Sequence, residues 1–84
     1  MTPQTPFMTA QTQLLQGDYK SALKTVKPAM ARHPKDARYP NLAGLAMCGL
    51  GQQRGAIPMF QKAIRLDPDD VKAHNNLDLV LSEQ

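Results

Sequence analysis

Residues 37–70 read ARYPNLAGLAMCGLGQQRGAIPMFQKAIRLDPDD, and the spacing of small and apolar residues within them predicts two helices. The first helix is indicated by residues that recur at helical intervals before Gly51 interrupts them: Ala43, Ala46, Met47 and Leu50. The 3.6-residue period then resumes at Ala56, Ile57, Phe60, Ala63 and Ile64. The second helix should end near Pro68, because the residue before a proline disfavours the helical conformation. Asp69 or Asp70 can then accept hydrogen bonds from the N–H groups that open the next helix.

The same pattern occurs elsewhere in the chain at an offset of about 34 residues. Towards the N-terminus the matching pairs are Gly17 and Gly51, Ala22 and Ala56, Ala29 and Ala63, Pro34 and Pro68, and Asp36 and Asp70. Towards the C-terminus they are Asn41 and Asn75, Leu45 and Leu79, and Met47 and Leu81. Such an ordered set indicates a repeat, and the whole chain is therefore expected to form five helices and no strands.

This pattern resembles the tetratricopeptide repeat (TPR) family, whose unit is a helix–turn–helix of about 34 residues with small residues where the helices cross. Gly44 takes the small position, and Gly17-Asp18-Tyr19 looks like the inter-helix turn of the family. The resemblance implies an all-α fold in which antiparallel helix hairpins stack as a short right-handed solenoid. It divides the chain into a first unit at 1–36 with a degenerate first helix, a second unit at 37–70, and a C-terminal capping helix or half repeat at 71–84.

Composition restricts the class of protein further. The chain has 84 residues, a net charge of +3, one Cys and no Trp. No run of apolar residues approaches the ~20 that a membrane span needs. A single Cys excludes an internal disulfide, so a reducing, cytoplasmic setting is expected. Residues 1–40 are basic, but no aromatic side chain interleaves with Lys20, Lys24 and Lys27. Nucleic-acid binding is therefore expected to be unlikely, and a solvated helix face is preferred.

No group of residues indicates catalysis, and we expect no enzyme activity and no cofactor or metal. The glycines between Gly44 and Gly55 lack the preceding strand and the Lys-Ser/Thr of a phosphate-binding loop. Cys48 has no neighbouring base that would activate its thiol. The TPR resemblance instead implies a scaffold for contacts between proteins.

The resemblance also places a groove on the first helices of the units. In the first unit its positions fall at Gln4, Phe7, Gln11 and Leu14. The peptide-binding residues that we predict are Arg38, Asn41, Leu45, Lys72, Asn75 and Leu79. Here Arg38 and Lys72 would hold an acidic group, the two asparagines would bond to a peptide backbone, and the leucines would form an apolar floor. Ordinary solvated residues on a helix face are the alternative.

Two further hypotheses follow from how short the array is, because about three repeats are usually needed for stability. The chain could be the N-terminal segment of a larger enzyme, such as a bacterial sulfotransferase or glycosyltransferase. Alternatively, copies could associate as a homodimer through exposed terminal helices. The apolar residues expected to pair are Phe7, Met8, Leu14 and Leu15 with Leu77, Val80 and Leu81.

Overall fold

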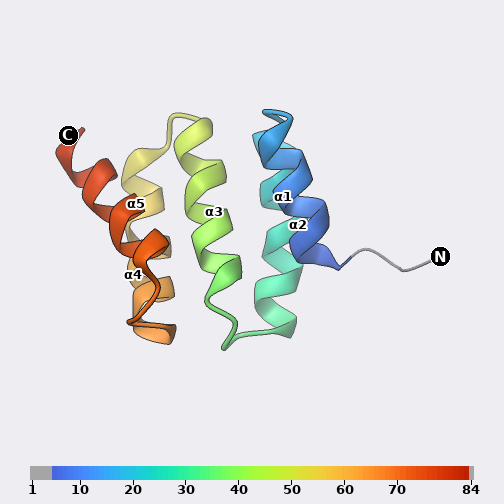
Figure 1. Cartoon of the computed structure of the whole chain (residues 1–84). Helices are drawn as coiled ribbons and strands as arrows, with labels where there is room; N and C mark the ends of the chain where they lie inside the picture. The colour runs from blue at the N-terminus through green and yellow to red at the C-terminus, as the bar shows by residue number, and fades with distance from the viewer. Residues whose placement is uncertain (1–4, 84) are drawn as a thin grey trace.

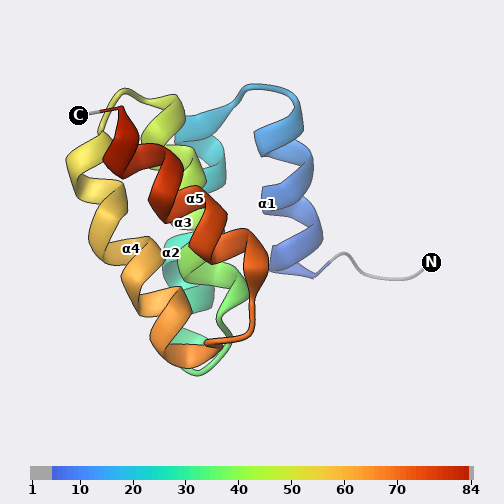
Figure 2. The ribbon, with the colours of Figure 1, turned by 60° about the vertical axis from the view of Figure 1, so that its left-hand side comes forward.

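The computed structural model describes residues 5–83, and these residues form five helices and no strand. The helices are α1 (Pro6–Leu15), α2 (Tyr19–Arg32), α3 (Arg38–Gly49), α4 (Gln53–Leu66) and α5 (Val71–Ser82). In Figure 1, α1, α3 and α5 stand in a row nearest the viewer, and α2 and α4 lie behind them. Helix α3 packs against both α2 and α4, while α2 also contacts α1 and α4 also contacts α5. The expected all-α stack of helix hairpins is confirmed, with α1 and α5 at opposite ends of the row in Figure 1. In the turned view of Figure 2, α5 lies in front of α3 and α1 stands apart from them.

The repeat is visible in the hydrogen bonds of the turns. Gly17 and Gly51 both adopt a left-handed backbone, with φ of 77° and 81°. The Gly17 N–H donates to the carbonyl of Leu14, and the Gly51 N–H donates to the carbonyl of Cys48, three positions earlier in each case. The distance is 3.0 Å in both turns. The turn of the first hairpin therefore keeps the register of the second, and glycine is favoured at both positions because it alone enters this backbone region without a Cβ clash.

Aspartates mark where helices begin. The Asp70 Oδ1 accepts from the Lys72 N–H at 3.0 Å, which confirms the predicted cap of α5. Thirty-four residues earlier, the Asp36 Oδ1 accepts from the Arg38 N–H at 3.1 Å. Such bonds satisfy donors that a helix leaves unpaired at its first turn. Both aspartates lie in loops between helices, but the division of the chain into units after residues 36 and 70 remains a prediction.

The two hairpins fill their cores with different combinations of small and large side chains. Gly44 of α3 faces Phe60 of α4 so closely that a Cβ added at Gly44 would lie 2.4–2.8 Å from three ring atoms. The equivalent positions of the first hairpin hold Ala10 and Val26, which are fully buried in one hydrophobic cluster. A larger residue on α1 is thus matched by a smaller one on α2, as close packing requires.

Two prolines lie within helices, beyond the first turn. Pro28 lies inside α2, which continues to Arg32. Pro58 lies in the second turn of α4, which begins at Gln53. Each proline lacks the N–H that would donate to the carbonyl four residues earlier, so both helices have one internal bond fewer.

One residue of the expected pairing surface is not available for pairing. Val80 is 3% exposed because it packs with Ala56 and Phe60 beneath α5. Our expectation that Val80 lies on an exposed terminal surface was therefore wrong. Met8, Leu15 and Leu81 are exposed as expected.

Candidate functional site

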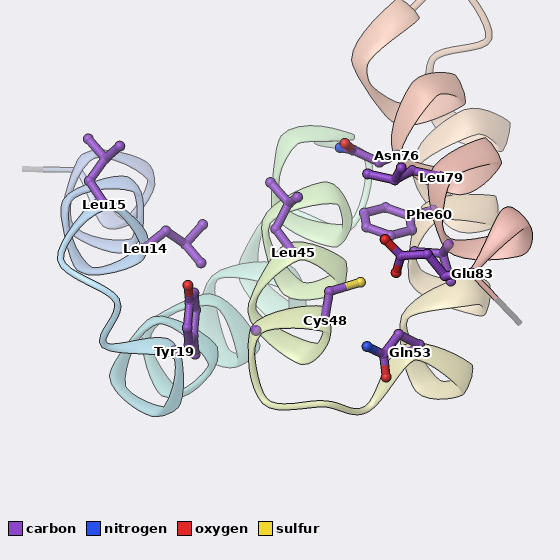
Figure 3. Close-up of a pocket in the computed structure, with 12 residues that line it drawn as sticks. Leu14, Leu15, Tyr19, Leu45, Cys48, Gln53, Phe60, Asn76, Leu79 and Glu83 are labelled. Atoms are coloured by element: carbon purple, nitrogen blue, oxygen red, sulfur yellow. The ribbon is translucent and has the colours of Figure 1, made fainter.

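The first helices of the hairpins form a face with two adjoining hollows. The polar hollow, of about 300 Å³, is lined by Phe7, Gln11, Arg38, Asn41, Leu42, Leu45, Asp70 and Lys72. The apolar hollow, of about 430 Å³, is lined by Leu14, Leu15, Tyr19, Leu45, Cys48, Gly49, Gln53, Phe60, Asn76, Leu79, Val80 and Glu83 (Figure 3). Leu45 of α3 lines both, so the two hollows lie next to each other on this face. We call the two together the groove.

The structure brings five of the six predicted site residues into this groove. Arg38, Asn41 and Lys72 line the polar hollow, Leu79 lines the apolar hollow, and Leu45 lies between them. Asn75 is exposed and lines neither hollow. Of the first-unit positions, Phe7, Gln11 and Leu14 line the groove, whereas Gln4 lies outside the described residues.

An asparagine pair connects α3 with α5 at the groove. The Asn76 Nδ2 donates to the Asn41 Oδ1 at 2.9 Å, and both side chains are half-buried. The sequence predicted that Asn41 and Asn75, which are one repeat apart, would both face the groove, whereas the structure places Asn76 there and bonds it to Asn41. Repeat-equivalent residues point in the same direction from parallel helices, so a residue bonds to a different position of the next helix. The geometry of stacked helices, and not the offset alone, would have indicated Asn76.

Arg38 is held in place by two contacts at one end of the polar hollow. Its Nη2 lies 2.8 Å from the Asp36 Oδ2, and its Nε donates to the Asp36 Oδ1 at 3.0 Å. Its guanidinium carbon also lies 4.5 Å from the centre of the Phe7 ring, a cation–π distance. Lys72 has no ion pair within residues 5–83. The polar hollow therefore presents one cation that is oriented and paired with Asp36, one cation without an ion pair, and the carboxylate of Asp70.

This contact gives Asp36 a pH-dependent role. The hydrogen bond from Arg38 lowers the pKa of the Asp36 carboxyl below its ordinary value of 3.8. A carboxyl whose pKa is lower when folded stabilises the protein above its unfolded pKa and loses that contribution as the pH falls through its folded pKa. We expect Asp36→Asn to cost about 0.2–1 kcal/mol at pH 7, since the pair is partly exposed. The difference from wild type should shrink below about pH 4.

Urea unfolding followed by circular dichroism at pH 7, 4 and 3 measures this difference. Asp78→Asn provides the control, because Asp78 is exposed and forms no ion pair within the described helices. A constant difference between wild type and Asp36→Asn across these pH values would contradict the assigned role.

The apolar hollow holds the single thiol of the chain. Burial raises the pKa of the Cys48 thiol, and the nearby Glu83 carboxylate raises it further. A thiol with a raised pKa is poorly ionised at neutral pH and is a weak nucleophile. Figure 3 shows Leu14 of α1 pointing toward α3, Leu45 on α3, and Phe60 and Leu79 on the far side of α3. All four side chains line the same hollow. This hollow is therefore suited to receive an apolar side chain.

Residues 5–83 offer neither a metal site nor a membrane-spanning helix. No group of three or more His, Cys, Asp or Glu residues among residues 5–83 could hold a metal ion. None of the helices formed by these residues combines the length and apolar character that crossing a bilayer requires.

Fold and groove together define an all-α helical-repeat protein, and comparisons with known proteins specify which repeat. No family model matches the sequence. The structure of MamA residues 41-end from Desulfovibrio magneticus RS-1 superimposes with a TM-score of 0.88 at 33% identity, over 93% of this chain and 44% of that chain. A double mutant titled MamA RS-1 ArsTM gives the same values. MamA is a TPR-repeat protein, and this chain accordingly has a TPR-like fold.

One relative of this chain is a much longer protein. The chain is 34% identical to Protein FlbA of Caulobacter vibrioides over 55 residues, which is 66% of this chain and 9% of FlbA. The chain thus spans less than half of the proteins it matches. The fold and these relatives are those of a protein-interaction helical-repeat module.

Proposed function

We propose that this chain is a non-catalytic module that binds a peptide segment of a partner protein in the groove. The observation that carries the proposal is the junction of a polar and an apolar hollow at Leu45, on the face formed by α1, α3 and α5. A short peptide offers both a polar backbone and side chains of either kind, and sites of this class are mostly apolar with a few placed polar groups. The sequence still predicts a cytoplasmic setting.

Each part of the groove has a distinct task in this proposal. The asparagine pair uses one donor of Asn76 and the oxygen of Asn41, and no other hydrogen bond to either side chain occurs within residues 5–83. The remaining Asn41 N–H groups and the Asn76 oxygen can therefore bond to a peptide backbone. Lys72 and Arg38 attract an acidic side chain or a terminal carboxylate. The apolar hollow takes a large apolar side chain a few residues away.

A selection from a random peptide library displayed on phage tests the proposal without a known partner. We expect the selected peptides to combine an acidic residue with a large apolar one. Arg38→Glu with Lys72→Glu should weaken their binding by at least about tenfold, the factor for 1.4 kcal/mol. That is less than the cost of breaking two charge-assisted contacts.

The control is a variant with the same change of charge on another face. Lys24→Glu with Lys27→Glu likewise replaces two cations by two carboxylates, but both residues lie on α2, away from the groove. It should retain binding of the selected peptides. Equal losses in both variants, or a selection that returns no binder, would contradict the groove assignment.

We also propose that two copies of this chain associate. Leu15 is 85% exposed at the end of α1, and Met8 and Leu81 are about half exposed. Covering them would remove apolar surface from water, which favours association. Light scattering of the purified chain should give the mass of a dimer, and Leu15→Glu should shift it to a monomer. A wild-type monomer at high concentration would contradict this proposal.

A further inference from the structure

The charges of this chain are sorted by layer. Helices α2 and α4 carry seven Lys or Arg residues and no Asp or Glu. These residues are Lys20, Lys24, Lys27, Arg32, Arg54, Lys62 and Arg65. Within residues 5–83 every aspartate and glutamate lies instead in a loop, at a helix cap or on α5. The layer formed by α2 and α4 therefore carries positive charge only, and none of its Lys or Arg residues lines the groove.

Most of these cations point away from the rest of the protein. The buried residues of α2 are Ala22, Val26 and Ala29, spaced by four and three positions. Lys20, Lys24 and Lys27 have the same spacing and lie two positions earlier. Two residues rotate a helix by about 200°. The lysines therefore lie opposite the buried stripe, and all three are exposed.

Helix α4 continues this surface. Its buried stripe is Ala56, Phe60 and Ala63, and Arg54 and Arg65 lie on the opposite side and are exposed. Arg54 is the repeat equivalent of Lys20, so it occupies the corresponding end of its helix. We define the basic face by its five outward residues: Lys20, Lys24, Lys27, Arg54 and Arg65.

No carboxylate forms an ion pair with this face. The ion pair between Arg38 and Asp36 is the single one within residues 5–83, and it lies at the groove. The five cations are therefore hydrated and available. From this arrangement we infer that the basic face binds duplex nucleic acid through its phosphates, without reading the base sequence.

The chemistry of the face selects this polyanion over two others. Anionic membranes are bound by helices that add apolar anchors to their cations, yet none of the exposed large hydrophobic residues lies on α2 or α4. Single strands are bound by stacking of bases on aromatic side chains, and the basic face has none. That absence is why the sequence made nucleic acid appear unlikely. It does not apply to a duplex, whose phosphates require only cations.

Fluorescence anisotropy with a labelled mixed-sequence DNA duplex of about 25 base pairs tests this inference. We expect binding at about 20 mM salt, with an affinity that falls linearly with salt on a double-logarithmic plot. Lys24→Glu with Lys27→Glu should lower the slope of that plot by about two, one for each lost phosphate contact, and weaken binding by at least about tenfold. A second duplex of different sequence should bind equally well.

The groove variant Arg38→Glu with Lys72→Glu is the matched control, because both double variants lower the net charge by the same amount. It should bind the duplex with the slope of the wild type. Absence of binding at low salt, or equal losses in the two variants, would overturn the inference. Binding to vesicles containing phosphatidylserine but not to the duplex would also overturn it. Because the peptide selection reports on the opposite face, either proposal can fail alone.

Discussion

Replacing Gly44 by alanine should destabilise the protein by about 1–3 kcal/mol, the range for overpacking a well-filled core. The added methyl group would lie within 2.8 Å of three atoms of the Phe60 ring. Phe60 of α4 is fully buried and packs against both Gly44 of α3 and Val80 of α5, so moving its ring away from the added methyl group would disturb its other contacts. Because a small repeat array is marginally stable, this loss should lower the midpoint of urea unfolding clearly.

The first hairpin suggests which second change would relieve the clash. It holds Ala10 and Val26 at the positions of Gly44 and Phe60, and both are fully buried. Phe60→Val in the presence of Gly44→Ala should therefore lose less stability than the two single changes added together, with a coupling of about 1 kcal/mol or more. Additive losses, measured by urea unfolding of all four proteins, would show that α3 and α4 do not approach as closely as described.

Replacing Pro28 by alanine should have a large effect of opposite sign. Pro28 is exposed within α2, so the change removes little packing. Alanine would supply the N–H that can donate to the Lys24 carbonyl, and proline inside a helix costs about 3 kcal/mol relative to alanine. Proline also restricts the unfolded chain, which offsets about 0.4–1 kcal/mol of this gain. We expect a net stabilisation of about 2 kcal/mol.

Thermal and urea unfolding measure this gain, with Pro34→Ala as the control. Pro34 is exposed in the loop after α2, where no helical hydrogen bond is missing. Its replacement should leave stability unchanged or slightly lower. An unchanged or lower stability of Pro28→Ala would mean that α2 has adapted to its proline at no cost.

Much of the fold could be predicted from the sequence because its signals are local. A glycine that follows such a helical pattern ends the helix, as Gly51 does with its left-handed backbone. Asp70 caps a helix by accepting from the N–H of Lys72, only two residues away. A repeat multiplies such local signals, since the same turn at Gly17 supports the one at Gly51. This is why five helices and the face that carries the groove could be predicted.

Contacts between helices were harder to predict, because they depend on how far one helix is shifted along the next. Asn75 was favoured over Asn76, and Val80 was placed on the surface, for this reason. The grouping of the basic residues in space was also difficult to predict from the sequence. Along the sequence the basic residues gather in the first half, whereas in space they gather on α2 and α4.

The alkylation rate of Cys48 tests most directly whether the groove receives a partner. Cys48 is the single thiol of the chain and lines the apolar hollow, so its reaction with iodoacetamide reports on that hollow alone. A selected peptide at a concentration of about ten times its Kd should slow the reaction about tenfold, in proportion to the unbound fraction. The DNA duplex, bound on the other layer, should leave the rate unchanged. An unchanged rate with saturating peptide would contradict the account, because the peptide would then lie elsewhere.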